Sequence, residues 1–382
     1  MNSVYASLGT TVFEVMSRLA AERGAVNLGQ GFPEQDGPRD ILEAAARATL
    51  EGPNQYPPMR GLPDLRAAVA AHYNTHHALD LDWQREVTIT SGATEAIAAA
   101  LLAFIEPGDE VVLFEPLYDA YLPMVRRAGG VPRIVRLQPP HWRFERETLA
   151  AAFSAKTRVV VINTPLNPSA SMMSRDELTM LAELCRAHDA ICVSDEVWEH
   201  LTFDGVRHVS MLEALRDRTL KIGSAGKMFS LTGWKVGFAC GAPALMDQFA
   251  KAHQFLTFTT PPNLQRAVTY ALSKPATYYD EMCAAFQRSR DRLVAALEGG
   301  GFVTLPARGA YFVSVDLAAS GIGMSDEAFA RHAIEHGVAS IPYSAFYAAP
   351  GAPALLRLCF AKKDATLDRG AEALIKAKRA LA

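Results

Sequence analysis

Seven short apolar runs recur between residues 87 and 240, and they constrain the fold more than any other feature of the chain. Most of them are continuously apolar rather than alternating, which is typical of strands covered by helices on both faces. Helical segments lie between most of the runs, for example TEAIAAALLAF (94–104) and SRDELTMLAELCRAH (174–188). This alternation predicts an α/β fold with a layered sheet. The predicted strands are VTIT (87–90), EVVLFE (110–115), PRIVRL (132–137), RVVVIN (158–163), AICVSD (190–195), TLKIGS (219–224) and VGFACG (236–241).

The pattern changes near residue 285, where helices begin to outnumber strands. FQRSRDRLVAALEGGG (286–301) and SDEAFARHAIEHG (325–337) are helical in character, with one strand-like run, GAYFVSVDL (309–317), between them. At 382 residues the chain is long enough for two domains. We expect a large domain at 42–284 and a smaller α+β domain formed by 1–41 together with 285–382.

The composition and charge of the chain indicate which kinds of binding partner to expect. The net charge of −3 gives no electrostatic reason to bind nucleic acid or an anionic membrane. The apolar run AIAAALLAFI (96–105) is half of the roughly 20 residues that a membrane span needs. The five cysteines show no metal or redox spacing, so reduced thiols in a cytoplasmic protein and no metal site are expected.

In a sheet of this class, ligands bind beyond the carboxyl ends of the strands, so the residues that follow each strand deserve the closest reading. After VTIT comes the small-residue turn SGATEAI (91–97), which opens a helix. The free backbone N–H groups of Gly92 and Ala93 and the hydroxyl of Thr94 suit a phosphate, although an ordinary strand-to-helix turn has the same composition.

Three further strand ends carry candidate ligand groups. Tyr118 follows EVVLFE and offers an aromatic face, or plain packing. Asn167 precedes a proline and either caps a turn or points into a cleft. Asp195 ends a buried run, where a carboxylate needs a cationic partner, either a ring nitrogen of a ligand or a local lysine or arginine.

Ser224 and Lys227 follow the strand TLKIGS, in the stretch SAGKMFSLTGWKVG (224–237). GSAGKM has the wrong spacing for a phosphate-binding P-loop, and no strand leads into GxGxxG. A lysine whose pKa is lowered by burial can condense with an aldehyde. One ligand, pyridoxal 5′-phosphate, needs a phosphate cup, an amine, a carboxylate, a hydrogen-bond donor and an aromatic face together.

With these features the sequence resembles the fold-type I, pyridoxal-phosphate-dependent aminotransferases of class I/II, and within them the kynurenine, glutamine and methionine aminotransferase branch. That family has a large domain with a mostly parallel, seven-stranded sheet. The motifs occur in the family's order. They are NLGQGFP (27–33), NQYPPMRG (54–61), SGATEAI, EPLYDAY (115–121), NTPLNPSA (163–170), SDEVWEHL (194–201), SAGKMFSLTGWKVG and LRLCFAKKDATL (356–367).

The resemblance implies catalytic roles for Lys227, Asp195 and Tyr118. Lys227 would form the aldimine with the cofactor and carry the proton, Asp195 would hold the pyridine nitrogen protonated, and Tyr118 would stack on the ring. Asn167 would donate to the phenolic oxygen. The phosphate would be bound by Gly92, Ala93, Thr94, Ser224 and Lys235, with Tyr56 from a partner subunit.

The chain departs from the family's pattern at two of these positions. Trp198 stands where a tyrosine commonly donates to the phenolic oxygen, and Lys235 stands where many relatives have arginine. An indole N–H is also a donor, and a lysine replaces the planar fork of arginine with a point charge.

On the substrate side, the resemblance implies that Arg357 and the Gly31 backbone hold the α-carboxylate, beside Asn167. Phe13, with Phe258 and Thr259 from the neighbouring subunit of a homodimer, would line an apolar pocket for a methionine, glutamine, aromatic or kynurenine side chain. The implied reaction is a ping-pong transfer of the amino group from an L-amino acid to a 2-oxo acid.

Two other enzymatic functions stay open at this point. A carbon–sulfur β-lyase acting on cysteine conjugates and a succinyl-diaminopimelate aminotransferase would use the same cofactor and lysine. A regulator built on this fold would carry a DNA-binding domain, and the first forty residues are too few and not basic.

Overall fold

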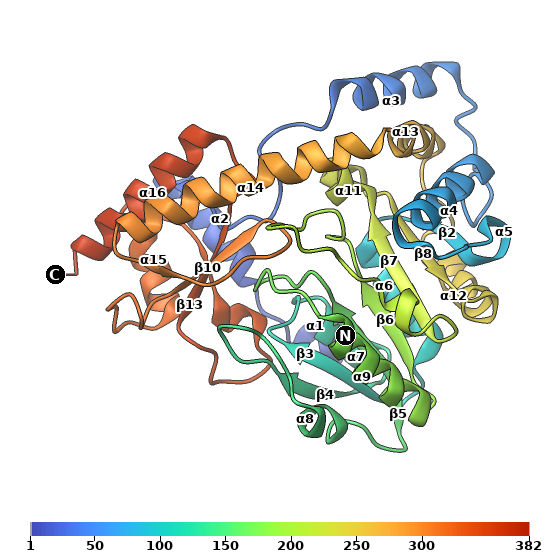
Figure 1. Ribbon diagram of the computed structural model, residues 1–382, viewed down its shortest axis with the longest axis horizontal. Coiled ribbons are helices and arrows are strands. Elements are labelled where there is room, and N and C mark those ends of the chain that lie inside the picture. Colours follow the sequence, from blue (N-terminus) through green and yellow to red (C-terminus); the bar gives the residue numbers. More distant parts are fainter. Residues whose placement is uncertain (1, 382) are drawn as a thin grey trace.

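The computed structural model describes residues 2–381, and its centre is a seven-stranded sheet (Figure 1). The strand order is β2-β8-β7-β6-β5-β3-β4. Strand β8 is antiparallel to both neighbours, whereas all other neighbouring pairs are parallel. This confirms the predicted α/β class with a mostly parallel sheet. The strands are β2 (Val87–Thr90), β3 (Glu110–Glu115), β4 (Val131–Arg136), β5 (Thr157–Asn163), β6 (Ile191–Asp195), β7 (Thr219–Ser224) and β8 (Gly237–Gly241).

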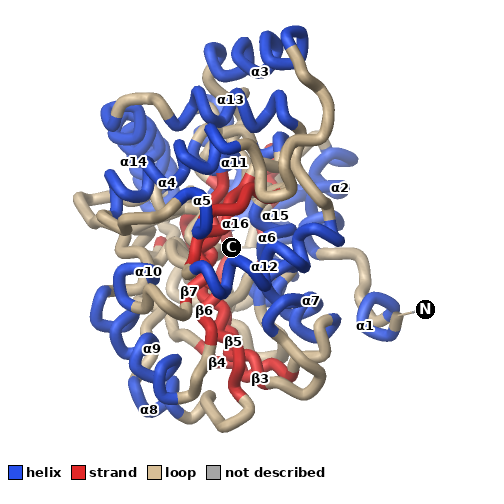
Figure 2. The backbone as a smooth tube through the Cα atoms, turned by 90° about the vertical axis from the view of Figure 1, so that its right-hand side faces the viewer, coloured by secondary structure: helices blue, strands red, loops and turns tan. Residues whose placement is uncertain are grey.

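Helices cover both faces of this sheet, as Figure 2 shows. Every residue of β2, β3, β7 and β8 is buried, which explains the apolar interiors of β3 and β8, whereas β2 and β7 also bury polar side chains such as Thr88 and Lys221. The edge strand β4 instead alternates exposed and partly buried residues over its first four positions, and only Val135 in it is buried. The longer helices are α2 (Val12–Arg23), α3 (Arg39–Glu51), α4 (Pro63–His77), α6 (Ala93–Phe104), α7 (Tyr121–Arg127), α9 (Arg175–Ala187), α12 (Pro243–Leu256), α13 (Pro262–Leu272), α14 (Ala276–Gly299), α15 (Asp326–Glu335) and α16 (Asp364–Arg379). The short ones are α1 (Ser3–Ala6), α5 (Trp83–Glu86), α8 (Arg146–Ala150), α10 (Met211–Ala214) and α11 (Ala225–Met228).

A second, smaller sheet lies in the C-terminal part of the chain. Its strand order is β12-β13-β10-β9, and α14, α15 and α16 lie beside it (Figure 1). The N-terminal segment joins this part, because β1 pairs in parallel with β11 and α2 packs against α15. The strands are β1 (Val26–Asn27), β9 (Val303–Thr304), β10 (Phe312–Asp316), β11 (Val338–Ala339), β12 (Ile341–Pro342) and β13 (Leu355–Cys359).

Helix α14 is the long connection between the two sheets, and it runs without a break through position 285 (Figure 1). The proposed division at 284/285 therefore falls inside a helix rather than in a loop. The pairing of β1 with β11 is what supports grouping 1–41 with the C-terminal part.

Local sequence signals begin several of these helices. The side chain of Ser174 caps α9 and forms a capping box with Glu177, and Thr11 caps α2. Proline occupies the first turn of α4, α12 and α13. None of the helices within residues 2–381 has the length and apolar character needed to cross a membrane.

The parallel strands determine where the functional residues lie. Because β5, β6 and β7 point in the same direction, their last residues, Asn163, Asp195 and Ser224, fall at one edge of the sheet. Strand β2 is antiparallel to β8, and β8 is antiparallel to β7, so β2 runs in the same direction as β7. The turn after Thr90 therefore lies at the same edge of the sheet.

Candidate active site

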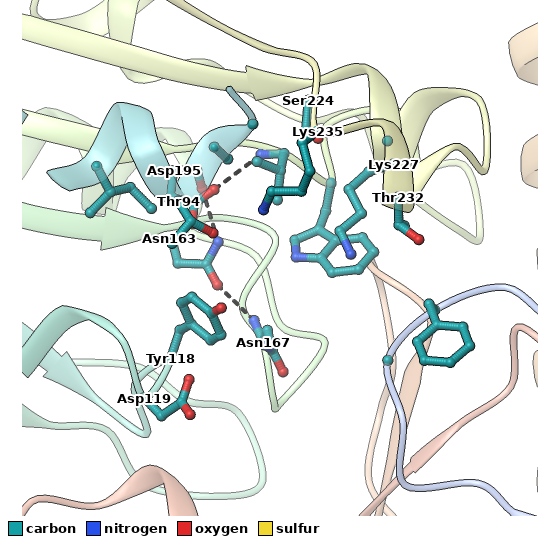
Figure 3. Close-up of a pocket in the computed structure, with 18 of the residues that line it drawn as sticks. Thr94, Tyr118, Asp119, Asn163, Asn167, Asp195, Ser224, Lys227, Thr232 and Lys235 are labelled. Carbon is teal, nitrogen blue, oxygen red and sulfur yellow. Dashed lines mark hydrogen bonds between the residues drawn. The ribbon is translucent and has the colours of Figure 1, made fainter. Parts of the chain in front are cut away.

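A cavity of about 460 Å³ opens at this edge of the sheet (Figure 3). Thirteen residues named from the sequence line it, and they come from both parts of the chain. They are Phe13, Gly31, Gly92, Ala93, Thr94, Tyr118, Asn167, Asp195, Trp198, Ser224, Lys227, Lys235 and Arg357.

Lys227 lies in the short helix α11, directly after β7, and its amine points into the cavity (Figure 3). Its Nζ donates to the hydroxyl of Tyr311 at 3.0 Å and lies 4.5 Å from the ring centroid of Trp198. Among the described residues no carboxylate forms an ion pair with it, and burial lowers its pKa to about 8. A substantial fraction of this amine is therefore neutral near physiological pH, which is the nucleophilic form.

Asp195 ends β6 with its carboxylate buried. Its Oδ2 accepts a hydrogen bond of 2.6 Å from the hydroxyl of Tyr121, and burial raises its pKa to about 6. No lysine or arginine of the described chain pairs with it, so the alternative of a local salt bridge is not what the structure has. A buried carboxylate in this state suits a cationic ring nitrogen on a ligand.

The turn after β2 forms a cradle at the N-terminus of α6. Gly92 has φ 79°, in the left-handed region that favours glycine, and a Cβ on it would lie 3.3 Å from Nζ of Lys235. The side chains of Thr94 and Ser224 lie around the same space (Figure 3). The N-terminus of a twelve-residue helix, two hydroxyls and an ammonium group together suit a phosphate.

At the other side of the cavity, Arg357 of β13 is almost fully buried. Its guanidinium donates to Oδ1 of Asn167 at 2.8 Å and to the Gly29 carbonyl at 2.6 Å, and Phe312 lies 4.2 Å from it. Its Nε has no hydrogen-bond partner in the part of the chain that is described, and burial lowers its pKa to about 10. A buried guanidinium with an open donor is suited to a carboxylate.

Comparison with known proteins identifies the family that carries this arrangement. The family model "Aminotransferase class I and II" matches residues 23–374. The chain is 41% identical to the methionine aminotransferase of Escherichia coli over 371 residues, which are 96% of each chain. It is 35% identical to the human kynurenine–oxoglutarate transaminase 1, over 94% of each chain. The solved structure of N-succinyldiaminopimelate aminotransferase from Mycobacterium tuberculosis superposes with a TM-score of 0.95 at 41% identity, covering 99% of this chain and 100% of the other.

The chain belongs to the class I and II aminotransferase family. The resemblance predicted from its motifs is thereby confirmed, and so are the fold type and the assignment as a transferase.

Three residues named from the sequence lie outside the cavity of this aminotransferase chain. Tyr56 is 84% exposed, and its ring packs edge-on against that of Phe258, with 5.7 Å between centroids. The hydroxyl of Thr259 donates to the Pro58 carbonyl at 3.4 Å. Their expected place in a neighbouring subunit's site stays a prediction.

The structure adds residues that the sequence reading did not single out. The hydroxyl of Tyr121 donates a hydrogen bond to Asp195. The hydroxyl of Tyr311 accepts a hydrogen bond from Lys227 and donates one to the Gly31 carbonyl at 2.6 Å. Asn163 donates to the Asp195 carbonyl and accepts from the backbone N–H of Asn167, so it links the two loops (Figure 3). Asn163 ends a predicted strand, and the strand-end rule applied to it would have found it.

Ten further residues line the cavity without having been named from the sequence. Most are apolar or small, and Asp119 is the one acidic addition. They are Thr11, Phe32, Ile97, Asp119, Asn163, Val197, Gly226, Thr232, Val236 and Phe312.

Proposed function

We propose that this aminotransferase binds pyridoxal 5′-phosphate in the cavity and transfers the amino group of an L-amino acid to a 2-oxo acid. One observation carries the proposal: a single cavity holds an amine with a lowered pKa, a buried carboxylate without a cation, and a buried guanidinium without a carboxylate. When bound, the cofactor supplies an aldehyde and an electron-withdrawing ring that stabilises negative charge at the substrate's α-carbon.

The residues fit that cofactor group by group. Gly92, Ala93, Thr94, Ser224 and Lys235 would hold the phosphate at the N-terminus of α6. Asp195 would pair with the ring nitrogen and keep it cationic, and Tyr121 would orient Asp195. Tyr118 and Trp198 would provide aromatic contacts to the ring and to the groups around it.

Asn167 and Lys227 would act on the reacting side. Because Oδ1 of Asn167 accepts from Arg357, its Nδ2 is the end that would donate to the phenolic oxygen. Lys227 would capture the aldehyde, and its amine, once released by substrate, would move the α-proton. Tyr311 holds the lysine amine in the cavity by its hydrogen bond.

Arg357 would bind the substrate's α-carboxylate with its open donor, beside the Gly31 backbone. Phe13 and Phe312 lie 5.3 and 4.2 Å from the guanidinium and make this end of the cavity apolar. Asp119 lines the same space, so a second carboxylate on a substrate would meet a negative charge there. We therefore propose substrates with apolar or aromatic side chains, such as methionine or phenylalanine, and include glutamine and kynurenine.

The proposed assembly is a homodimer with shared active sites. The support is the exposed apolar pair of Tyr56 and Phe258, next to Phe255, which is 85% exposed. We also propose a cytoplasmic location, which the five free cysteines support.

The test is a transfer assay with purified protein, pyridoxal phosphate, a panel of L-amino acids and one 2-oxo acid. We expect the amino acid product of the acceptor to appear by mass spectrometry, fastest with methionine or an aromatic donor, and Lys227→Ala to abolish it. Release of pyruvate and ammonia from a cysteine conjugate, without transfer, would show a β-lyase instead. Selective use of succinyl-diaminopimelate would contradict the apolar specificity.

A further inference from the structure

We propose that His72, His76 and His200 form a binding site for a late first-row divalent metal ion, with Zn²⁺ as the best fit. One imidazole nitrogen of each histidine lies within 4.8 Å of the others. None of the three lines the cavity described above, so this site is separate from the proposed transamination site.

Two of the ligands come from one helix. His72 and His76 are four residues apart near the end of α4, so their rings lie on the same face one turn apart, stacked with 4.1 Å between centroids. His200 comes from the loop after β6, and its Nε2 lies 2.7 Å from Nε2 of His72. The site therefore joins α4 to the segment that follows Asp195 and Trp198.

Hydrogen bonding prepares His76 as a ligand. Its Nδ1 lies 2.9 Å from the His72 carbonyl, which can only accept, so Nδ1 carries the proton. In the neutral ring this tautomer leaves the lone pair of Nε2 for a metal ion, and the carbonyl fixes the ring orientation as second-shell partners do in metal sites.

His72 and His200 are joined by a hydrogen bond of 2.7 Å between their Nε2 atoms, so one of these two nitrogens carries a proton. When an ion enters, that proton has to move to Nδ1 of its own ring, which leaves both Nε2 atoms available as ligands. His72 is 6% exposed, whereas His76 and His200 are half-buried, which leaves a route for an ion from solvent.

The charged groups behind the histidines favour a cation. Glu199 precedes His200 and is bonded to Tyr73 at 2.8 Å and to His77 at 3.2 Å. It shares the buried ammonium of Lys221 with Glu196, at 2.7 and 3.1 Å. Two buried carboxylates therefore share one ammonium next to the three rings, and acidic groups in this position favour a cation over an anion.

The ligand set selects the ion. Three imidazole nitrogens and an open fourth position are typical of Zn²⁺, and also accept Co²⁺, Ni²⁺ and Cu²⁺, whereas Mg²⁺ and Ca²⁺ require oxygen ligands. In a tetrahedral site, bonds of about 2.05 Å place neighbouring nitrogens about 3.3 Å apart. The rings of His72 and His200 therefore have to separate by about 0.6 Å when the ion enters.

The experiment uses holoenzyme that has been treated with a chelator and then titrated with Co²⁺ or Zn²⁺. We expect one ion per chain, ligand-field absorption bands typical of tetrahedral Co²⁺, and a rise in melting temperature. In His76→Gln the affinity should fall by at least about tenfold. His200→Gln serves as a second variant if the first one is poorly folded.

His336→Gln is the matched control. His332 and His336 form another histidine pair four residues apart, edge-to-face with 4.6 Å between centroids. His332 is hydrogen-bonded to the Ala377 carbonyl, and the pair has no third histidine within reach among the described residues. This variant should bind metal as the wild type does. The proposal is wrong if the wild type binds neither ion, or if His76→Gln and His200→Gln bind as tightly as His336→Gln.

Discussion

At the scale of single residues, the proposed capture of pyridoxal phosphate by Lys227 leads to a prediction about pH. Because the neutral amine is the nucleophile and burial lowers its pKa to about 8, we expect the rate of pyridoxal phosphate capture by cofactor-free protein to rise with pH and level off above about pH 8. The rate is followed by the change in visible absorbance after mixing, and Lys227→Ala should give no such change.

The substitution Tyr311→Phe tests whether the hydrogen bond between Tyr311 and Lys227 affects the pKa of the lysine. The hydroxyl of Tyr311 accepts from Nζ of Lys227 and so stabilises the charged ammonium. Without it, the pKa of Lys227 should fall further, and the midpoint of the capture profile should move to lower pH by about one unit. A profile identical to that of the wild type, or one moved to higher pH, would contradict this role.

Asp195 gives a second prediction at this scale, because its burial raises the pKa of the carboxyl from 3.8 to about 6. Above pH 6 the folded, cofactor-free protein holds an unpaired buried charge, so Asp195→Asn should stabilise it, by up to about 3 kcal/mol. The gain should disappear as the pH falls from 6 towards 4, since the wild-type carboxyl then takes up a proton. Thermal unfolding across this pH range measures it.

The same substitution should weaken the holoenzyme. With the cofactor bound, the carboxylate would have its cationic partner, and an amide cannot replace that charge. Pyridoxal phosphate affinity and transfer rate should therefore both fall in Asp195→Asn, the rate by at least about a hundredfold. An unchanged rate would remove Asp195 from its proposed place at the ring nitrogen.

At the scale of elements, most strands of the large sheet were predictable from the sequence, whereas many of the hydrogen bonds that hold the candidate site residues in place were not. The run at residues 110–115 matched β3 because the interior of a strand covered on both faces is apolar, and the run at 219–224 matched β7 although the buried Lys221 interrupts it. The residues that follow those strands were found because ligands of such a sheet bind beyond the carboxyl ends of its strands. Phe13, Gly31, Arg357 and Tyr56 were named only through the resemblance to the family.

Tyr121 and Tyr311 show why the remainder could not be predicted. Tyr121 begins a helix and meets Asp195 74 positions away, and Tyr311 meets Lys227 84 positions away and Gly31 280 positions away. Local periodicity carries no information about contacts at such separations. The same holds for His200, which meets His72 across 128 positions.

Strand β7 carries an element-scale prediction at Lys221. This lysine is fully buried, and its ammonium group binds both Glu196 and Glu199. Lys221→Met would leave two buried carboxylates without a cation, so the free energy of unfolding should fall by about 3–5 kcal/mol. Denaturant titration of the holoenzyme measures the change.

Lys251→Met on the exposed face of α12 is the control for that variant, since within residues 2–381 the ammonium of Lys251 makes one hydrogen bond, of 3.4 Å, to Gln248. It should change stability by less than about 0.5 kcal/mol. Equal effects at positions 221 and 251 would mean that the buried network contributes nothing specific to stability.

At the scale of the whole molecule, an exposed apolar cluster suggests a partner surface. Tyr56 and Phe255 are 84% and 85% exposed, and Leu256 and Phe258 are 44% and 40% exposed. Monomeric proteins rarely leave such a group of large apolar side chains in water. If the chain forms the proposed homodimer through this surface, Phe255→Asp should shift it to monomer in sedimentation, whereas Val303→Asp, at an exposed site on β9, should leave the proposed dimer intact.

Sharing of the active site across that dimer can be tested by mixing two inactive chains. If Tyr56 serves the partner's cofactor, a Lys227→Ala chain supplies an intact Tyr56 to the intact lysine of a Tyr56→Ala chain. After subunit exchange in an equal mixture, half of the dimers are hybrids, and each hybrid has one working site out of its two. Activity should therefore recover to about a quarter of the wild-type value. If each chain used its own Tyr56, both sites of the hybrid would be defective and mixing would restore nothing. Recovery therefore separates a shared site from a merely dimeric one, which sedimentation alone does not do.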